Sequence, residues 1–236
     1  MFTANPPRHA PRTRVVHIPA ESGSLAAELT VPRALVGVVV FARTNAAHRQ
    51  TRYDHQLAEK LQASGFATLL LDLLTPAEEL VDAATCAMRA DLALVSRRLI
   101  EVIDWLDDQS ELLGLDIGIV GEEIGAAAAF VAACVRPRRV AAIVSYAERL
   151  DLAGPVLARV HVPSLLIVAG SDEDHVRSNN TAFRQLDCGK ELVRIAVDRF
   201  TTRSALDDEV SRLAHDWLSR MMTPVLPHAS AAHSFS

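Results

Sequence analysis

The chain has 236 residues, 50% of them hydrophobic and 22% charged, and a formal net charge of −5 at pH 7. This composition is enough for one sizeable hydrophobic core and excludes an intrinsically disordered protein. The acidic balance argues against a nucleic-acid-binding protein, which needs a basic surface, and the apolar runs are far shorter than the roughly 20 residues of a membrane-spanning helix.

The two ends of the chain are rich in proline and polar residues. Residues 1–12 contain no apolar segment of the kind found in a signal peptide, and residues 223–236 show no periodicity. We therefore expect flexible ends around one domain at 13–222. The three cysteines are an odd number without metal-ligand spacing, which suits a reducing compartment and predicts a cytoplasmic protein. The preference for arginine over lysine and the many alanines hint at a bacterial source.

Strand-like and helix-like patterns alternate through the domain, beginning with a hairpin around the turn at 21–24. Short runs rich in Val, Ile and Leu predict strands at 15–18, 25–31, 35–42, 66–71, 116–120, 140–145, 164–169 and 191–197. Apolar residues at helical spacing, or runs of alanine, predict helices at 53–64, 89–109, 125–135, 178–186 and 205–221. The alternation predicts an α/β fold with a mostly parallel sheet of about eight strands, helices on both faces and, because the connections are short, no lid domain.

The most informative segment is the peptide G-E-E-I-G at 121–125, which joins the predicted strand 116–120 to the alanine-rich helix. A strand, a tight turn between two glycines and a helix form the context in which G-x-S-x-G presents a catalytic serine. Glu123 takes the place of that serine. The pattern therefore indicates a hydrolase-like fold in which the usual nucleophilic hydroxyl is missing.

Three stretches, at 66–76, 121–129 and 164–172, together resemble the α/β-hydrolase superfamily, and in particular its small, dienelactone-hydrolase-like branch. The similarity extends from about residue 15 to residue 220. It implies an α/β-hydrolase fold and a triad of a serine or cysteine nucleophile, an aspartate and a histidine, in that chain order. It also implies an oxyanion hole made by backbone N–H groups after the nucleophile and in the loop after an early strand.

Carried over to this sequence, the resemblance puts Glu123 in the nucleophile's position and Asp172 in the acid's position, so these are the candidate catalytic residues. The loop that should hold the base contains no histidine between residues 198 and 203. The candidate binding residues are those of the oxyanion loop and the turn positions beside Glu123: Ala42, Arg43, Thr44, Asn45, Glu122 and Ile124. A Ser-His-Asp mechanism is not available from these positions.

Three interpretations of the site remain open. In the first, catalysis is lost and the scaffold binds a small molecule or a protein partner. In the second, Glu123 acts as a carboxylate nucleophile or general base with Asp172; the segment 172–175 could instead hold a divalent ion, or Asp172 could simply cap the next helix. In the third, hydrolysis uses other side chains at the sheet edge, for which the candidates are Ser145, Ser171, His48 and His55.

Charged and apolar side chains outside the motif suggest further contacts. Arg43, Arg49 and Arg52 make the oxyanion loop basic, and they either pair with the acids of the turn and fill the former pocket or bind an anionic ligand. The last helix could expose an apolar patch to a second copy of the chain, through Leu213, Trp217, Leu218 and Met221. No cofactor or metal is expected, since no recognised ligand spacing is present, and Cys134 is expected to be a structural thiol.

Overall fold

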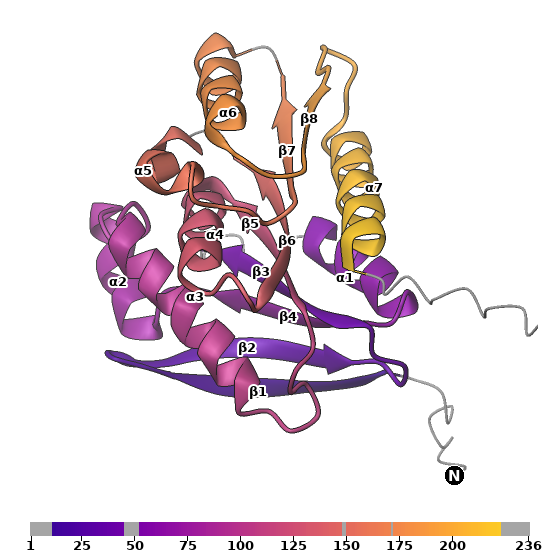
Figure 1. Cartoon of the computed structure of the whole chain (residues 1–236). Helices are drawn as coiled ribbons and strands as arrows, with labels where there is room; N and C mark the ends of the chain where they lie inside the picture. The colour runs from indigo at the N-terminus through magenta and orange to yellow at the C-terminus, as the bar shows by residue number, and fades with distance from the viewer. Residues whose placement is uncertain (1–10, 45–51, 148–149, 171, 223–236) are drawn as a thin grey trace, which may run out of the picture.

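The computed structural model of the chain describes residues 11–44, 52–147, 150–170 and 172–222, and its helices cover both faces of a central sheet (Figure 1). The sheet has eight strands in the order β1-β2-β4-β3-β5-β6-β7-β8. Their bounds are β1 (Arg12–Ala20), β2 (Gly23–Val31), β3 (Gly37–Arg43), β4 (Phe66–Asp72), β5 (Ile117–Glu122), β6 (Val140–Tyr146), β7 (Ser164–Ala169) and β8 (Lys190–Ile195). Only the pairs β1–β2 and β2–β4 are antiparallel, so the predicted mostly parallel sheet is confirmed.

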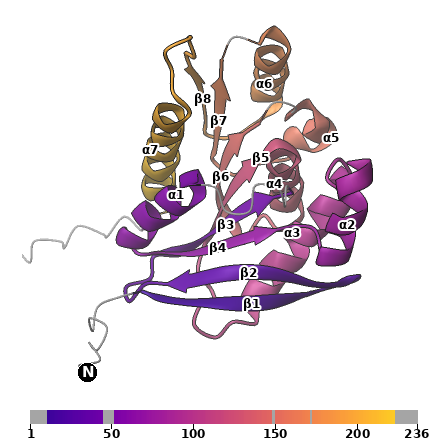
Figure 2. The same cartoon turned by 180° about the vertical axis from the view of Figure 1, so that it is seen from behind.

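The helices divide into two layers, as the views from the front and from behind show (Figures 1 and 2). One layer holds α1 (Arg52–Ala63) and α7 (Arg203–Met222). The other holds α2 (Pro76–Thr85), α3 (Leu92–Asp107), α4 (Glu123–Val135), the 3₁₀ helix η2 (Leu150–Ala153), α5 (Gly154–Leu157) and α6 (Glu173–Gln185). The hydrophobic core is correspondingly split into two clusters, one between the sheet and each helical layer.

The apolar face of α7 belongs to the core and not to a surface patch. Trp217 is 3% exposed and Leu218 is fully buried, and both pack in the cluster beneath α1 and α7. Leu213 and Met221 pack partly buried against the same cluster. The prediction that this helix offers an apolar face to a second copy is therefore wrong, because the sheet already covers that face.

The sequence patterns missed α2 and the short helices η2 and α5, and they placed the starts of α3 and α6 several residues away from those observed. α2 begins at a capping box in which the Thr75 hydroxyl accepts from the Glu78 N–H and the Glu78 carboxylate accepts from the Thr75 N–H. α3 starts at Leu92 instead of residue 89, because Asp91 caps it. α6 starts at Glu173, five residues before the predicted 178, since its first turn is polar and gives no hydrophobic signal.

The predicted flexible segments, 1–12 and 223–236, lie outside the described residues apart from residues 11 and 12, and Arg12 already belongs to β1. No helix within the described ranges is both long and apolar enough to cross a membrane.

Candidate active site

The turn between β5 and α4 has the geometry of a nucleophile elbow. Glu123 is in the left-handed region, with φ = 47°, where a non-glycine residue is strained. A Cβ on Gly125 would lie 2.2 Å from the carbonyl oxygen of Ala42, and one on Gly121 would lie 2.5 Å from Cα of Ala126. Both glycines are therefore required by the close approach of α4 to β3 and to its own strand.

The side chain of Glu123 is exposed. Its place at the first position of α4 puts a carboxylate next to the positive end of the helix dipole. The pKa of Arg89 is raised, first by its hydrogen bond to Asp82 and to a smaller extent by the charge of Glu123. Glu123 thus puts a carboxylate in an electropositive setting, at the position where the resemblance expects the nucleophilic hydroxyl.

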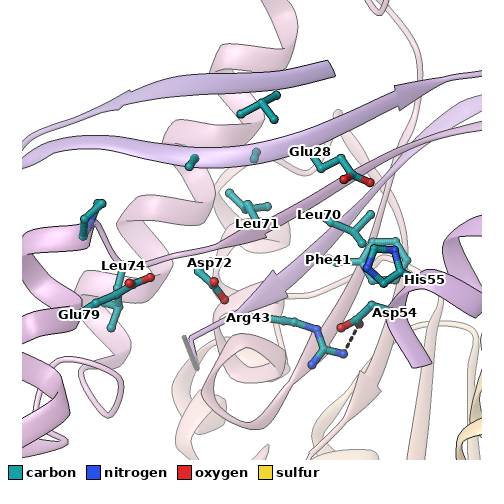
Figure 3. Close-up of a pocket in the computed structure, with 14 residues that line it drawn as sticks. Glu28, Phe41, Arg43, Asp54, His55, Leu70, Leu71, Asp72, Leu74 and Glu79 are labelled. Atoms are coloured by element: carbon teal, nitrogen blue, oxygen red, sulfur yellow. Dashed lines mark ion pairs between the residues drawn. The ribbon is translucent and has the colours of Figure 1, made fainter. Parts of the chain in front are cut away.

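Arg43, the last residue of β3, lies in the segment that the resemblance assigns to the oxyanion loop. Its guanidinium donates two parallel hydrogen bonds to Glu122, each 2.9 Å long, and forms an ion pair with Asp54 in the first turn of α1. The Arg43 side chain is only 11% exposed, and its guanidinium carbon lies 5.8 Å from the centroid of the Tyr53 ring. Figure 3 shows Arg43 and Asp54 joined beside a groove in the surface. We call the set of Arg43, Glu122 and Asp54 the arginine cluster.

In the arginine cluster, two carboxylates form ion pairs with one guanidinium that is largely shielded from solvent. Burial alone would lower the pKa of Arg43, but the charges of Glu122 and Asp54 more than offset it and raise the pKa. The pKa of Glu122 is raised by burial and further by Asp54, against the pull of Arg43. Burial also raises the pKa of Tyr53 well above its ordinary value. The Tyr53 hydroxyl and Arg43 Nε are buried without a hydrogen-bond partner among the described residues.

The acid's position is used for helix capping. Asp172 is exposed, and its carboxylate accepts from the backbone N–H groups of Asp174 and His175 at the start of α6. These bonds lower the pKa of Asp172. Asp172 follows β7 and Glu123 follows β5, with β6 between them, so their strands are roughly 10 Å apart. Asp172 therefore caps α6, as one of the alternatives predicted from the sequence has it.

The base's position, in the loop after β8, holds a small polar turn. The Asp198 carboxylate accepts from the Phe200 N–H and the Thr201 hydroxyl. The imidazoles of His161 and His215 bond elsewhere, to the carbonyl of Asp187 and the hydroxyl of Ser64. Across the described parts of the chain, no three His, Cys, Asp or Glu residues gather as a metal ion requires.

Beside the arginine cluster lies a cavity of about 390 Å³ between the β1–β2 hairpin and the first turns of α1 and α2 (Figure 3). We call it the hairpin groove. Its polar lining is contributed by Glu28, Arg43, Asp54, His55, Asp72 and Glu79, and its apolar lining by side chains of all four neighbouring strands. Among the described residues, this lining includes four carboxylates and one guanidinium.

The fold and the sequence of the chain are both similar to those of known proteins. The fold superimposes on a crystal structure of a dienelactone hydrolase from Anabaena variabilis with a TM-score of 0.84 and 35% sequence identity, covering 91% of this chain and 100% of that one. The chain belongs to the α/β-hydrolase superfamily, in its dienelactone-hydrolase-like branch. A dienelactone-hydrolase-like promiscuous phosphotriesterase from metagenomic libraries shares the fold, with a TM-score of 0.71 at 19% identity over 90% of this chain.

A curated relative extends the comparison to longer proteins. A protein of Mycobacterium tuberculosis, provisionally named a phosphoribosyl transferase, is 38% identical over 216 residues, which are 91% of this chain and 47% of the relative. The same match is found in a second strain. The chain thus spans about half the length of the curated relatives it matches. No protein-family model matches the sequence.

The residues predicted for the site lie in different environments. Arg43 and Glu122 contact each other in the arginine cluster, so Arg43 pairs with an acid of the turn, as one of the two alternatives for it predicted. Ala42, Thr44 and Ile124 are all buried, at 0%, 4% and 8% exposure, and Ala42 and Ile124 belong to the core. Asn45, His48, Arg49 and Ser171 lie outside the described residues, and so does the side chain of Arg52.

Other candidates from the sequence sit in different places. Ser145 is fully buried within β6, and His55 lines the hairpin groove. Cys134 is half-buried beside the core, in keeping with a structural thiol. Tyr53 and Asp54 were not singled out, because they are placed at the site only by the packing of α1 and no local spacing marks them.

Proposed function

We propose that this chain is a non-catalytic dienelactone-hydrolase-like protein that binds a small-molecule ligand or a protein partner. The arginine cluster is the observation that carries the proposal. The Arg43 guanidinium lies where the resemblance expects the oxyanion loop, but Glu122 and Asp54 engage it, so its charge is not offered to a developing oxyanion. Glu122 directly precedes Glu123, so the arginine cluster links the turn between β5 and α4 to the end of β3.

The alternative is a hydrolase that uses Glu123 as a carboxylate nucleophile or as a general base, with Asp172. It is favoured by the retained elbow conformation and by the exposure of the Glu123 carboxylate at a helix N-terminus. It is weakened by the capping bonds of Asp172, which direct that carboxylate to the backbone of α6. An ester intermediate on Glu123 would also need a base to activate water.

Hydrolysis of a series of p-nitrophenyl esters by the wild type, Glu123→Gln and Glu123→Ser separates the two possibilities. We expect no turnover above the uncatalysed rate from any of the three proteins. Turnover by the wild type that disappears in Glu123→Gln would reject the proposal and make Glu123 a catalytic carboxylate. Glu173→Gln, which alters a carboxylate at the same position of α6, is the matched control and should behave as the wild type does.

We further propose that the activity for which the longer mycobacterial relatives are named belongs to the part of them outside the match. The matched part has the α/β-hydrolase fold in this chain, and it makes up 47% of the relative. A phosphoribosyl transferase is accordingly the first protein partner to test, by co-purification from an extract of the source cell. This chain alone should release no pyrophosphate from phosphoribosyl pyrophosphate.

The cellular setting is also a proposal. We propose a cytoplasmic protein that contacts neither nucleic acid nor membrane, which is supported by the acidic net charge and by three cysteines that form no disulfide. Fractionation of the source cell tests this placement, and recovery of the protein in the membrane or secreted fraction would contradict it.

A further inference from the structure

Helix α2 turns its apolar side toward the solvent. Leu80 and Val81 are 79% and 49% exposed, and Ala77 and Ala84 are exposed in the same stripe, at the spacing of one helix face. A surface helix ordinarily buries its apolar stripe against the core. We call the four residues Ala77, Leu80, Val81 and Ala84 the α2 ridge.

The inner side of α2 is held by ion pairs instead of apolar packing. Glu78 is buried and accepts a hydrogen bond from Arg98 of α3 at 2.9 Å, and the buried carboxylate of Asp82 forms an ion pair with Arg89. These two carboxylates lie one turn apart on the same side of the helix. The ridge is therefore not needed to attach α2 to its own chain, and apolar residues that gather on a surface in this way mark a contact with another molecule.

An apolar groove of about 540 Å³ lies between α3 and α4. Its apolar walls are Leu92 and Ile100 of α3 and Val131 of α4, and the small side chains of Ala93 and Ser96 complete its α3 side. We call it the α3–α4 groove. Its size and its apolar walls suit an inserted row of aliphatic side chains.

The α2 ridge and the α3–α4 groove flank α3. Arg98, which bonds to α2, is two residues away from both Ser96 and Ile100, which line the groove. Two residues correspond to a rotation of about 200° around a helix, so α2 and the groove lie on opposite sides of α3. Figures 1 and 2 both show α2 beside α3 at the margin of the molecule. A two-fold axis parallel to α3 therefore places the ridge of each copy over the groove of the other.

The size and charge of this face suit a second copy of the chain. α2, α3 and α4 have 10, 16 and 13 residues, so at about 1.5 Å per residue and about 10 Å between axes they form a face of roughly 600 Å². Two copies then cover roughly 1,200 Å², which is the lower end of the range of specific interfaces. The charged residues in the groove lining, Arg97 and Glu101, have opposite signs, so this lining does not repel its own copy.

We propose that the chain forms a two-fold symmetric dimer in which the α2 ridge of each copy packs into the α3–α4 groove of the other. Leu80 of one copy lies against Ile100 and Val131 of the other. Ridge and groove belong to one chain, so every contact occurs twice, whereas a different protein would have to supply a match to both. The inference goes beyond the proposed function, because neither feature includes a residue of the candidate active site.

Sedimentation velocity of the whole chain between about 1 and 100 µM measures this association. We expect reversible dimerisation with a Kd on the order of 10 µM, as suits an apolar interface of this size. Leu80→Asp puts a charge on the ridge and Ala93→Trp fills the groove, and each should raise the Kd at least about tenfold. Phe200→Asp is the matched control: it replaces an exposed apolar residue in the turn after β8, and it should leave the Kd unchanged.

Thermal melting of each variant checks that it is folded, and Ala84→Asp and Ala93→Leu are the second variants of ridge and groove. A chain that sediments as a monomer at about 100 µM, ten times the expected Kd, overturns the proposal and assigns the ridge to a different protein. A dimer that tolerates either the ridge variants or the groove variants also overturns it, because the proposed contact needs both features. The same holds if Phe200→Asp weakens the dimer as much as Leu80→Asp does.

Discussion

Glu123 holds a backbone conformation that costs a residue with a Cβ about 1 kcal/mol. Its side chain is exposed, so burial does not offset this strain. Within the described residues, Cys86 is the only other non-glycine residue with a positive φ, and it ends α2. The strain at Glu123 is therefore a property of the elbow, which keeps its shape with a glutamate at its tip.

Glu123→Gly tests this strain. We expect the free energy of unfolding to rise by about 0.5–1 kcal/mol, because glycine adopts a positive φ without a steric cost. Glu173→Gly is the matched control, since Glu173 also is an exposed glutamate that begins a helix, and there the change should destabilise the protein by about 0.5–1 kcal/mol. Urea denaturation of both variants measures the difference, and equal losses of stability would contradict the assignment.

The elbow as an element depends on close contact between α4 and the sheet. The row of alanines in α4 is fully buried, and the helix packs against β5, β6 and β3. Gly125 is the tightest point, because its Cα faces the carbonyl oxygen of Ala42 in the interior of the sheet. That carbonyl cannot move without disturbing the ladder between β3 and β5.

Gly125→Ala should accordingly destabilise the protein by at least about 3 kcal/mol, since the new methyl group overlaps a fixed backbone atom. Gly154→Ala places the same methyl group at the start of α5, where it meets nothing within 4 Å. That control should change the free energy of unfolding by no more than about 1 kcal/mol, in the stabilising direction. Thermal or urea unfolding that shows the two variants to be alike would exclude the close-contact explanation.

At the scale of the whole molecule, a buried ion pair ties the hairpin to two helices. Arg98 of α3 is 1% exposed and donates to Glu78 of α2 at 2.9 Å, to Glu101 at 3.0 Å and to the hydroxyl of Ser22 in the β1–β2 turn at 2.7 Å. Burial alone would raise the pKa of Glu78, but hydrogen bonds from Ser22, Thr75 and Arg98 lower it to about 2.

This pair predicts how stability depends on pH. The lowered pKa of Glu78 stabilises the fold above its ordinary value of 4.5, and this contribution is lost as pH falls toward about 2. Glu78→Gln should lower the free energy of unfolding by about 3 kcal/mol at pH 7, because it leaves the buried charge of Arg98 with one carboxylate fewer. The free energy of unfolding of this variant should also fall less steeply between pH 4.5 and 2 than that of the wild type. Glu209→Gln, in an exposed pair with Arg212, should cost less than about 1 kcal/mol. A steep acid transition retained in Glu78→Gln would contradict this account.

Elements that are specified by neighbouring residues match their predicted bounds best, whereas features that depend on distant residues do not. Strands such as 164–169 were predicted to the residue, because a short apolar run between polar ends is a local pattern. α2 was not predicted, although the sequence contains its start signal: Thr75 and Glu78 form a capping box, and Pro76 is at the first helical position. The apolar face of α7 was recognised as apolar but assigned to the surface, since periodicity does not say what covers a face.

By itself the sequence determined an α/β fold, the elbow between two glycines and the absence of a serine at its tip, because each is set by residues close together in the chain, and the resemblance of three stretches added the α/β-hydrolase family. Only the tertiary structure decided that Arg43 meets Asp54 and Glu122. These residues are brought together by strand order and by the docking of α1 on the sheet. Contacts between residues far apart in the chain therefore determine which charged groups meet at the site, whereas local patterns specify the helices and strands that carry them.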